Sequence, residues 1–170
     1  METIFFKGTP CHTYGSLPFV GEKAPCYHLV TPDLKEISCE DFAGKKVVLN
    51  IFPSLDTAVC AMSVRRFNQE ASSLDNTVVI CVSMDLPFAA KRFCTAEGIE
   101  DVIVGSAFRS PLFAQKYGLM MVDGPLAGLL ARAVVVIDEH REIIYRQLVE
   151  EITNQPDYAA ALEALKREKF

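Results

Sequence analysis

A cysteine that could act as a nucleophile follows a short turn in the first half of the chain, where a helix is expected to begin. The turn lies within residues 53–60 and follows an apolar, β-branched run at 47–52. That run predicts a buried strand, which ends at Pro53 because proline cannot continue a central strand. Beyond the turn, apolar residues recur at helical spacing, namely Cys60, Val64, Phe67, Ala71 and Leu74.

The chemistry of Cys60 depends on where this helix begins. Thr57 or Asp56 is expected to be the N-cap, so that Cys60 is in the first turn. Free N–H groups and the helix dipole favour an anion there, and a thiolate is the reactive form of cysteine. The competing interpretation is packing, because Cys60 lies on the apolar stripe and unpaired cysteine is a common core residue.

Composition restricts the classes of function. The chain has 170 residues, half of them hydrophobic, which predicts one domain spanning 1–170. A net charge of −5 argues against nucleic acid, and no apolar run approaches the ~20 residues that span a bilayer. The first residues do not resemble a cleaved signal peptide. The six cysteines are interpreted as thiols in a reducing cytoplasm, since a chain of this size needs no disulfide framework.

The order of predicted elements indicates an α/β fold. We expect hairpins at 2–15, around Gly8-Thr9-Pro10, and at 27–38; strands at 47–52, 77–84, 102–104, 133–137 and 142–149; and helices from Cys60, from Pro87 to Gly98 with Asp85 as a possible cap, at 111–117 and at 154–169. This order requires a mixed and mostly buried sheet. Residues 120–128 lack periodicity and are expected to form a loop.

The string Pro53-x-x-x-Thr57-x-x-Cys60 resembles the peroxidatic-cysteine signature of the peroxiredoxins, and most of all that of the atypical two-cysteine bacterial thiol peroxidase branch. The likeness extends over residues 45–67, 85–88, 92–94, 96–98, 124–126 and 131–138. It implies a thioredoxin-like fold of the peroxiredoxin type, with a mixed central sheet, flanking helices and an N-terminal β-hairpin extension.

The resemblance also implies roles for five residues. Cys60 would attack the hydroperoxide and become a sulfenic acid. Cys94 would resolve that acid as an intramolecular Cys60–Cys94 disulfide. Arg132 would stabilise the thiolate and polarise the peroxide, and Pro53 would shield the sulfur from water. Thr57 lies three residues before Cys60, so its hydroxyl faces the same side of the helix and can bond to sulfur or peroxide.

Each of these residues also has a structural interpretation. Arg132 could be a solvated charge at a strand end, and Cys94 a small half-buried residue of its helix. Thr57 could be an N-cap and nothing more, and Pro53 could simply end the strand. Of the remaining cysteines, Cys81 is expected in the core, whereas Cys11, Cys26 and Cys39 are interpreted as structural or incidental.

The implied function is a thiol peroxidase that reduces hydrogen peroxide and organic hydroperoxides, is recycled by thioredoxin, and serves antioxidant defence as a homodimer. No cofactor is expected, and His12, His28 and His140 are too scattered for a metal site. An apolar rim from Phe88 and from Met120 or Met121 would suit organic substrates.

Two alternatives remain open from the sequence. One is a redox sensor, which would use the same sulfenic acid. The other is a thiol–disulfide oxidoreductase, although threonine at position 57 replaces the first cysteine of a Cys-x-x-Cys motif. Two helical cysteines rarely lie within bonding distance. We therefore expect Cys60 and Cys94 to be apart when reduced, and oxidation to unwind the helix around one or both of them. The 85–98 segment is expected to unwind more readily than the first turn at 57–61.

Overall fold

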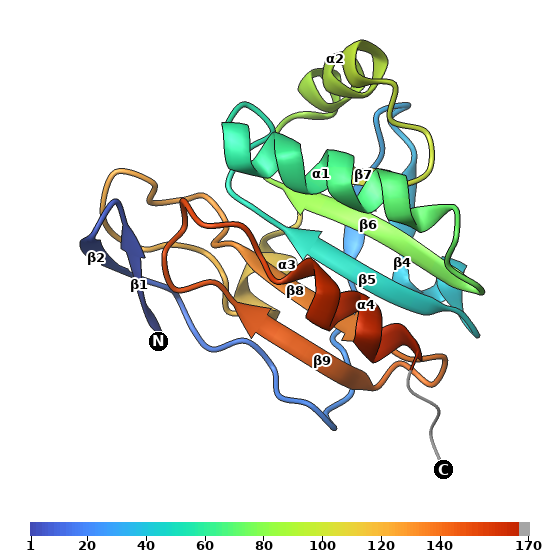
Figure 1. Ribbon diagram of the computed structural model, residues 1–170. Coiled ribbons are helices and arrows are strands. Elements are labelled where there is room, and N and C mark those ends of the chain that lie inside the picture. The colour runs from blue at the N-terminus through green and yellow to red at the C-terminus, as the bar shows by residue number, and fades with distance from the viewer. Residues whose placement is uncertain (167–170) are drawn as a thin grey trace.

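A seven-stranded mixed sheet forms the centre of the molecule in the computed structural model, which describes residues 1–166 (Figure 1). In sheet order, the strands are β4 (Glu36–Ser38), β3 (His28–Val30), β7 (Ile103–Ser106), β6 (Thr77–Ser83), β5 (Lys46–Ile51), β8 (Ala133–Ile137) and β9 (Ile143–Leu148). Strand β6 pairs in parallel with β5 and β7, and the other pairs are antiparallel. The predicted α/β fold with a mixed central sheet is therefore confirmed.

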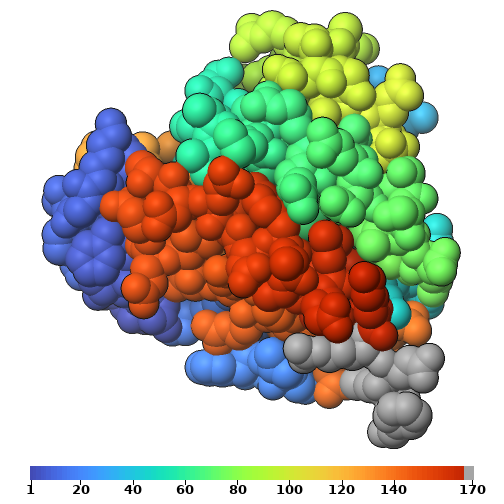
Figure 2. All heavy atoms as spheres, viewed as in Figure 1, coloured from blue at the N-terminus to red at the C-terminus, as the bar shows by residue number. Residues whose placement is uncertain are grey.

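Helices cover both faces of this sheet, because side chains alternate along each strand. Helices α1 (Ala58–Ala71), α2 (Pro87–Glu97) and α4 (Tyr158–Lys166) pack with Val48, Val134 and Val136 on one face. Helix α3 (Pro111–Lys116) packs on the opposite face, with Leu49 and Val135. Figure 2 shows α1 and α4 in contact on the first face, where the rings of Phe67 and Tyr158 lie 5.4 Å apart.

The N-terminal hairpin is confirmed, but its turn lies earlier than expected. Strands β1 (Thr3–Phe6) and β2 (Thr9–His12) leave Lys7 and Gly8 as the turn, both with positive φ. Thr9 and Pro10, which were expected in the turn, belong to β2. The Glu151 carboxylate accepts hydrogen bonds from the N–H groups of Lys7 and Gly8, at 3.3 and 2.8 Å. These bonds attach the hairpin to the segment after β9.

Two helix starts differ from the prediction. Leu86, not Asp85, is the N-cap of α2, because the Asp85 carboxylate bonds elsewhere, as described below. Helix α4 begins at Tyr158 rather than Asn154, and Pro156 precedes it. The predicted end of that helix at 167–169 lies outside the described residues. Pro87 at the start of α2 and left-handed Gly98 at its C-cap are as predicted.

A disulfide joins Cys26 and Cys39, contrary to the expectation that all cysteines are thiols. The register of the β3–β4 hairpin pairs His28 with Ser38, which brings the residues flanking the two strands together. The Cα atoms of the two cysteines are consequently 5.3 Å apart, within the range for a disulfide. Among residues 1–166, no helix is long and apolar enough to cross a bilayer.

Candidate active site

Cys60 lies in the first turn of α1, as the sequence predicts. Strand β5 leads to Pro53, which is buried, and the chain then turns into the helix. Thr57 is the N-cap with an extended backbone, so Cys60 is the third helical residue. Its side chain is fully buried against the first face of the sheet. The sulfur therefore lies where free helical N–H groups favour negative charge, in surroundings that exclude bulk water.

Arg132 lies next to this sulfur. It precedes β8, whose antiparallel pairing with β5 places Ala133 opposite Ile51. Arg132 Nη2 donates to Cys60 Sγ at 3.1 Å, and Nε donates to the Ile152 carbonyl at 2.8 Å. The side chain is only 1% exposed, so the interpretation of Arg132 as a solvated strand-end charge is wrong.

Among residues 1–166, the charge of Arg132 has no carboxylate partner. None of the ion pairs among residues 1–166 includes it, and its Nη1 is buried without a hydrogen-bond partner. An unaccompanied buried cation is costly, so an anion nearby would be strongly stabilised. A Cys60 thiolate would supply that anion, and an oxygen of a bound ligand would satisfy Nη1.

The Thr57 side chain does not make the expected capping bond. It occupies the N-cap position, but its hydroxyl donates to the Ser54 carbonyl at 3.1 Å. Because the hydroxyl hydrogen is used there, the oxygen remains available as an acceptor. The residue is exposed, one helical turn before Cys60. Thr57 could therefore accept a hydrogen bond from a protonated oxygen that approaches the sulfur.

Cys94 lies in the last turn of α2 and is half-buried. Burial raises the pKa of its thiol above the usual value. Its carbonyl accepts the N–H groups of Gly98 and Ile99, which close the C-terminal end of the helix. Cys60 and Cys94 are both free thiols in this structure. The geometry is consequently that of the reduced pair.

Asp85 organises the turn that leads to Cys60, a role that the sequence did not reveal. Its Oδ1 accepts from Ser54 Oγ at 2.8 Å, and its Oδ2 accepts from Leu55 N–H and Ser83 Oγ, both at 2.7 Å. Its carbonyl also accepts the hydroxyl of Ser106. One residue thus connects the turn before α1 with β6, with β7 and with the start of α2.

A second polar network lies beneath Cys60. Ser63 Oγ donates to the Cys60 carbonyl at 2.7 Å, and Asn50 Nδ2 donates to Ser63 Oγ at 3.1 Å. Asn50 is the last residue but one of β5 and is fully buried. The first turn of α1 is thereby bonded to the central strand. The polar Asn50 within the apolar 47–52 run was the available sequence signal.

Residues of the proposed apolar rim differ in exposure. Phe88 is 68% exposed and Met120 is half-buried. Met121 is fully buried, because it packs in the core on the α3 side of the sheet. Met121 cannot line a rim, and that part of the prediction is wrong.

Comparison with known proteins shows the family. Residues 19–162 match the Redoxin family. Thiol peroxidases of Corynebacterium glutamicum and Mycobacterium bovis are 54% and 53% identical to this chain, over 97% of it and 99% of each relative. The crystal structure of a peroxiredoxin-like protein from Aquifex aeolicus superposes with a TM-score of 0.92 at 39% identity, covering 98% of this chain and 96% of that one.

The chain therefore belongs to the redoxin family, and within it to the peroxiredoxins. Its curated relatives make it a peroxiredoxin enzyme of the thiol peroxidase kind. A thiol peroxidase from Chromobacterium violaceum, with a TM-score of 0.88 but 19% identity over 96% of this chain and 95% of that one, supports the same fold.

Asp85→Ala should loosen the turn before Cys60 without disturbing the sheet. Hydrogen bonds to charged groups contribute about 2 kcal/mol each, so exchange of the Leu55 amide should accelerate roughly tenfold or more. The rate at which peroxide oxidises Cys60 should fall, because the sulfur is less well positioned.

Amide hydrogen exchange and stopped-flow oxidation measure the two effects. Asp56→Ala, which removes an exposed carboxylate in the same turn, is the matched control and should change neither. Equal amide exchange rates and equal oxidation rates in the two variants would show that Asp85 does not position this turn.

Proposed function

We propose that this chain reduces hydrogen peroxide and organic hydroperoxides, with Cys60 as the attacking thiolate and Cys94 as the resolving cysteine. A dithiol of the thioredoxin type would return the enzyme to its reduced form. The observation that carries this proposal is the 3.1 Å contact between Arg132 Nη2 and Cys60 Sγ, made by a buried cation that pairs with no carboxylate in the part of the chain that the structure describes. A resting structural cysteine has no need of such a partner.

In the first step, the Cys60 thiolate attacks one oxygen of the hydroperoxide, and the O–O bond breaks. Cysteine becomes sulfenic acid, and the departing alkoxide takes a proton and leaves as alcohol or water. Arg132 Nη1, which is buried and unpartnered, is suited to donate to the oxygen that gains charge. Thr57 Oγ would accept the hydrogen bond of the protonated peroxide oxygen and so orient the substrate.

In the second step, the Cys94 sulfur attacks the Cys60 sulfenic acid, a disulfide forms and water departs. An external dithiol then reduces this disulfide and supplies the two electrons of the cycle. The raised pKa of the half-buried Cys94 thiol disfavours its thiolate in the folded helix. Exposure of Cys94 to water would remove that effect, so resolution is favoured by local opening of α2.

Helix α2 is suited to open in this way. It has 11 residues, and only Pro87 and Ala90 among them are buried. Short helices depend on packing for their stability, and sparse burial lowers the free energy of local unfolding. Helix α1, by contrast, is longer and is bonded to β5 through Ser63 and Asn50.

Hydrogen exchange should therefore differ between the reduced protein and the peroxide-treated protein. We expect faster exchange over residues 85–98 after oxidation, because disulfide formation requires helix α2 to unwind. Cys94→Ser is the matched control, since it can be oxidised at Cys60 but cannot form the bond. Unchanged protection in a protein whose Cys60–Cys94 bond is confirmed by mass would contradict the proposed opening.

Substitution of the two cysteines should separate the steps. Cys60→Ser should produce no alcohol from cumene hydroperoxide, because it lacks the nucleophile. Cys94→Ser should produce one equivalent of alcohol per chain and then stop, because its sulfenic acid cannot form the disulfide that thioredoxin reduces. Cys11→Ser, in the N-terminal hairpin, should turn over normally. Alcohol yield and thioredoxin oxidation measure these outcomes, and continued turnover by Cys60→Ser would refute the assignment.

Arg132→Met should slow the first step 10²–10³-fold, the usual effect of losing one transition-state donor. The protein should still fold, because the substitution removes an unpaired buried charge. Arg66→Met is the control, since the Arg66 guanidinium lies 5.6 Å from the centre of the Tyr158 ring rather than on the sulfur. Similar stopped-flow rates of Cys60 oxidation in the two variants would show that Arg132 has only a structural role.

Three coarser features complete the proposal. Residues 1–170 would act as one domain, since Glu151 holds the N-terminal hairpin. The chain would work in the cytoplasm, where dithiol reductants are abundant.

It would form a homodimer through the surface near α2 and the 118–128 segment, where Leu86, Phe88 and Val122 are exposed apolar side chains. Sedimentation at micromolar concentration tests the dimer.

A further inference from the structure

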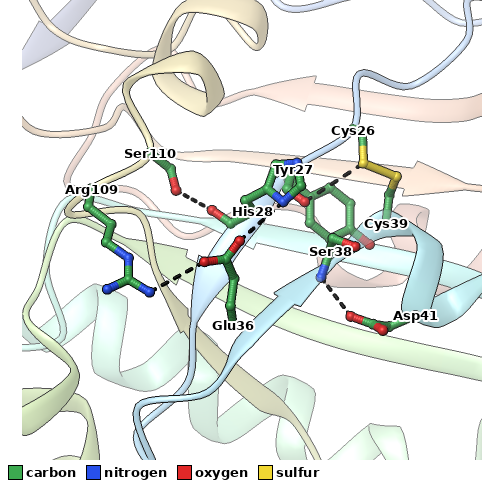
Figure 3. Close-up of polar contacts among 9 residues, drawn as sticks. All are labelled: Cys26, Tyr27, His28, Glu36, Ser38, Cys39, Asp41, Arg109 and Ser110. Atoms are coloured by element: carbon green, nitrogen blue, oxygen red, sulfur yellow. Dashed lines mark hydrogen bonds and ion pairs between the residues drawn. A yellow bond between two sulfur atoms is a disulfide. The ribbon is translucent and has the colours of Figure 1, made fainter.

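A disulfide lies at the edge of the sheet, apart from the candidate active site (Figure 3). Cys26 precedes β3, and Cys39 begins the short helix η1 (Cys39–Phe42) directly after β4. Thirteen positions separate the two cysteines in the sequence, so the bond closes the β3–β4 hairpin at its open end. Both residues are half-buried, which leaves the bond partly accessible to a reductant in solution.

A cation contacts one sulfur of this bond. Arg141 Nη2 lies 3.0 Å from Cys39 Sγ. Its backbone is fixed in the turn between β8 and β9, because its N–H donates to the Asp138 carbonyl and its carbonyl accepts the Ala24 N–H at 2.8 Å. A neutral disulfide sulfur gains little from a guanidinium, whereas a thiolate gains a charge-assisted hydrogen bond. The contact therefore stabilises the reduced Cys39 more than the oxidised one.

The surroundings of Cys39 carry further charge. A small cavity is lined by Cys39 together with Tyr27, Lys45, Asp138 and Arg141. Burial raises the pKa of the Tyr27 hydroxyl, so this group remains neutral. The Asp138 Oδ1 accepts the N–H groups of His140 and Glu142. Lys45 and Arg141 thus line the same cavity as Cys39, and Arg141 is the cation that contacts the sulfur.

The sheet separates this bond from the peroxidatic pair. Cys39 packs with Leu49 and Val135 on the α3 side, whereas Cys60 and Cys94 pack on the opposite face. The backbone of the sheet lies between the two sets of sulfurs. Direct exchange within one folded molecule would have to cross the sheet, so the reductant of the Cys26–Cys39 bond is expected to come from outside.

We propose that Cys26 and Cys39 form a second redox-active couple, which exchanges with an external dithiol, and that Arg141 stabilises Cys39 as the departing thiolate. A thiolate of the dithiol attacks Cys26 Sγ, the Cys26–Cys39 bond breaks, and its electron pair goes to Cys39. The second thiolate of the dithiol then attacks the mixed disulfide, and Cys26 leaves and takes a proton. Two electrons pass from the dithiol to the pair.

Reduction should loosen the edge of the sheet. Without the disulfide, β4 is held to β3 by three register pairs, and β3 is paired with β7 only at Val30 and Ser106. The exposed contacts of Glu36 with His28 and Arg109, seen in Figure 3, contribute little. The couple would thus remove or restore one restraint on the β3–β4 hairpin independently of turnover at Cys60, beside the bond from Ser110 Oγ to the His28 carbonyl and the burial of Leu29.

The test uses the double variant Cys60→Ser/Cys94→Ser, in which the peroxidatic pair cannot contribute. Dithiothreitol is added at fixed pH, samples are alkylated at intervals, and peptide masses follow Cys26 and Cys39 while circular dichroism monitors the fold. We expect complete reduction in the folded state. Adding Arg141→Gln should slow it about tenfold, because a poorer leaving thiolate departs more slowly. Arg109→Gln, on the same edge, should leave the rate unchanged.

A second readout identifies the leaving sulfur. Treatment with glutathione should trap the mixed disulfide on Cys26 and leave Cys39 free to be alkylated. If Arg141→Gln does not fold, Arg141→Lys is used instead; it keeps the charge and should retain most of the reduction rate. The cysteine on which glutathione is trapped then still tests which sulfur leaves. Reduction only after unfolding, equal rates for the Arg141 and Arg109 variants, or trapping on Cys39 would each overturn the proposal.

Discussion

Arg132 is a cation held inside the protein, with its Nη2 3.1 Å from the sulfur of Cys60. Burial of an unpaired charge is unfavourable, and the surrounding structure offsets only part of the cost, through the bond from Nε to the Ile152 carbonyl. The part of this cost that is not offset favours negative charge on the sulfur and on an oxygen beside Nη1. The antiparallel pairing of β5 with β8 is what places this arginine beside the first turn of α1.

The two cysteines of the cycle make opposite demands on the fold. Cys60 needs a rigid position, which Asp85 supplies through Leu55 and which Ser63 supplies through the central strand. Cys94, as the proposed resolving cysteine, would need freedom to bring its sulfur to Cys60. Asp85 fixes the chain just before α2, whereas the other end of that helix closes at left-handed Gly98. Opening from the C-terminal end would therefore release Cys94 and leave the support of Cys60 intact.

Local signals were sufficient to predict most of the fold. Proline, glycine and the apolar runs fixed the strands and helices to within a few residues, and the spacing from Thr57 placed Cys60 correctly. The resemblance to the peroxiredoxins placed Arg132 at the Cys60 sulfur, which the residues by themselves did not. The bond between Cys26 and Cys39 was not predicted, because it depends on strand pairing that the residues do not specify. Asp85 is a possible helix cap by sequence, since aspartate is a common N-cap residue, whereas its bonds to Ser54 and Leu55 depend on the fold.

An arginine contacts a cysteine sulfur at two places, Cys60 and Cys39. Whether that sulfur is a free thiol or part of a disulfide determines the chemistry that the contact supports. Cys60 is a free thiol at the start of a 14-residue helix, so Arg132 would stabilise an attacking thiolate. Cys39 is already bonded to Cys26, so Arg141 would stabilise a thiolate that departs. The same interaction would thus favour oxidation of one sulfur by peroxide and reduction of the other by a dithiol. Because the two lie on opposite faces of one sheet, each reaction would proceed without access to the other's sulfur.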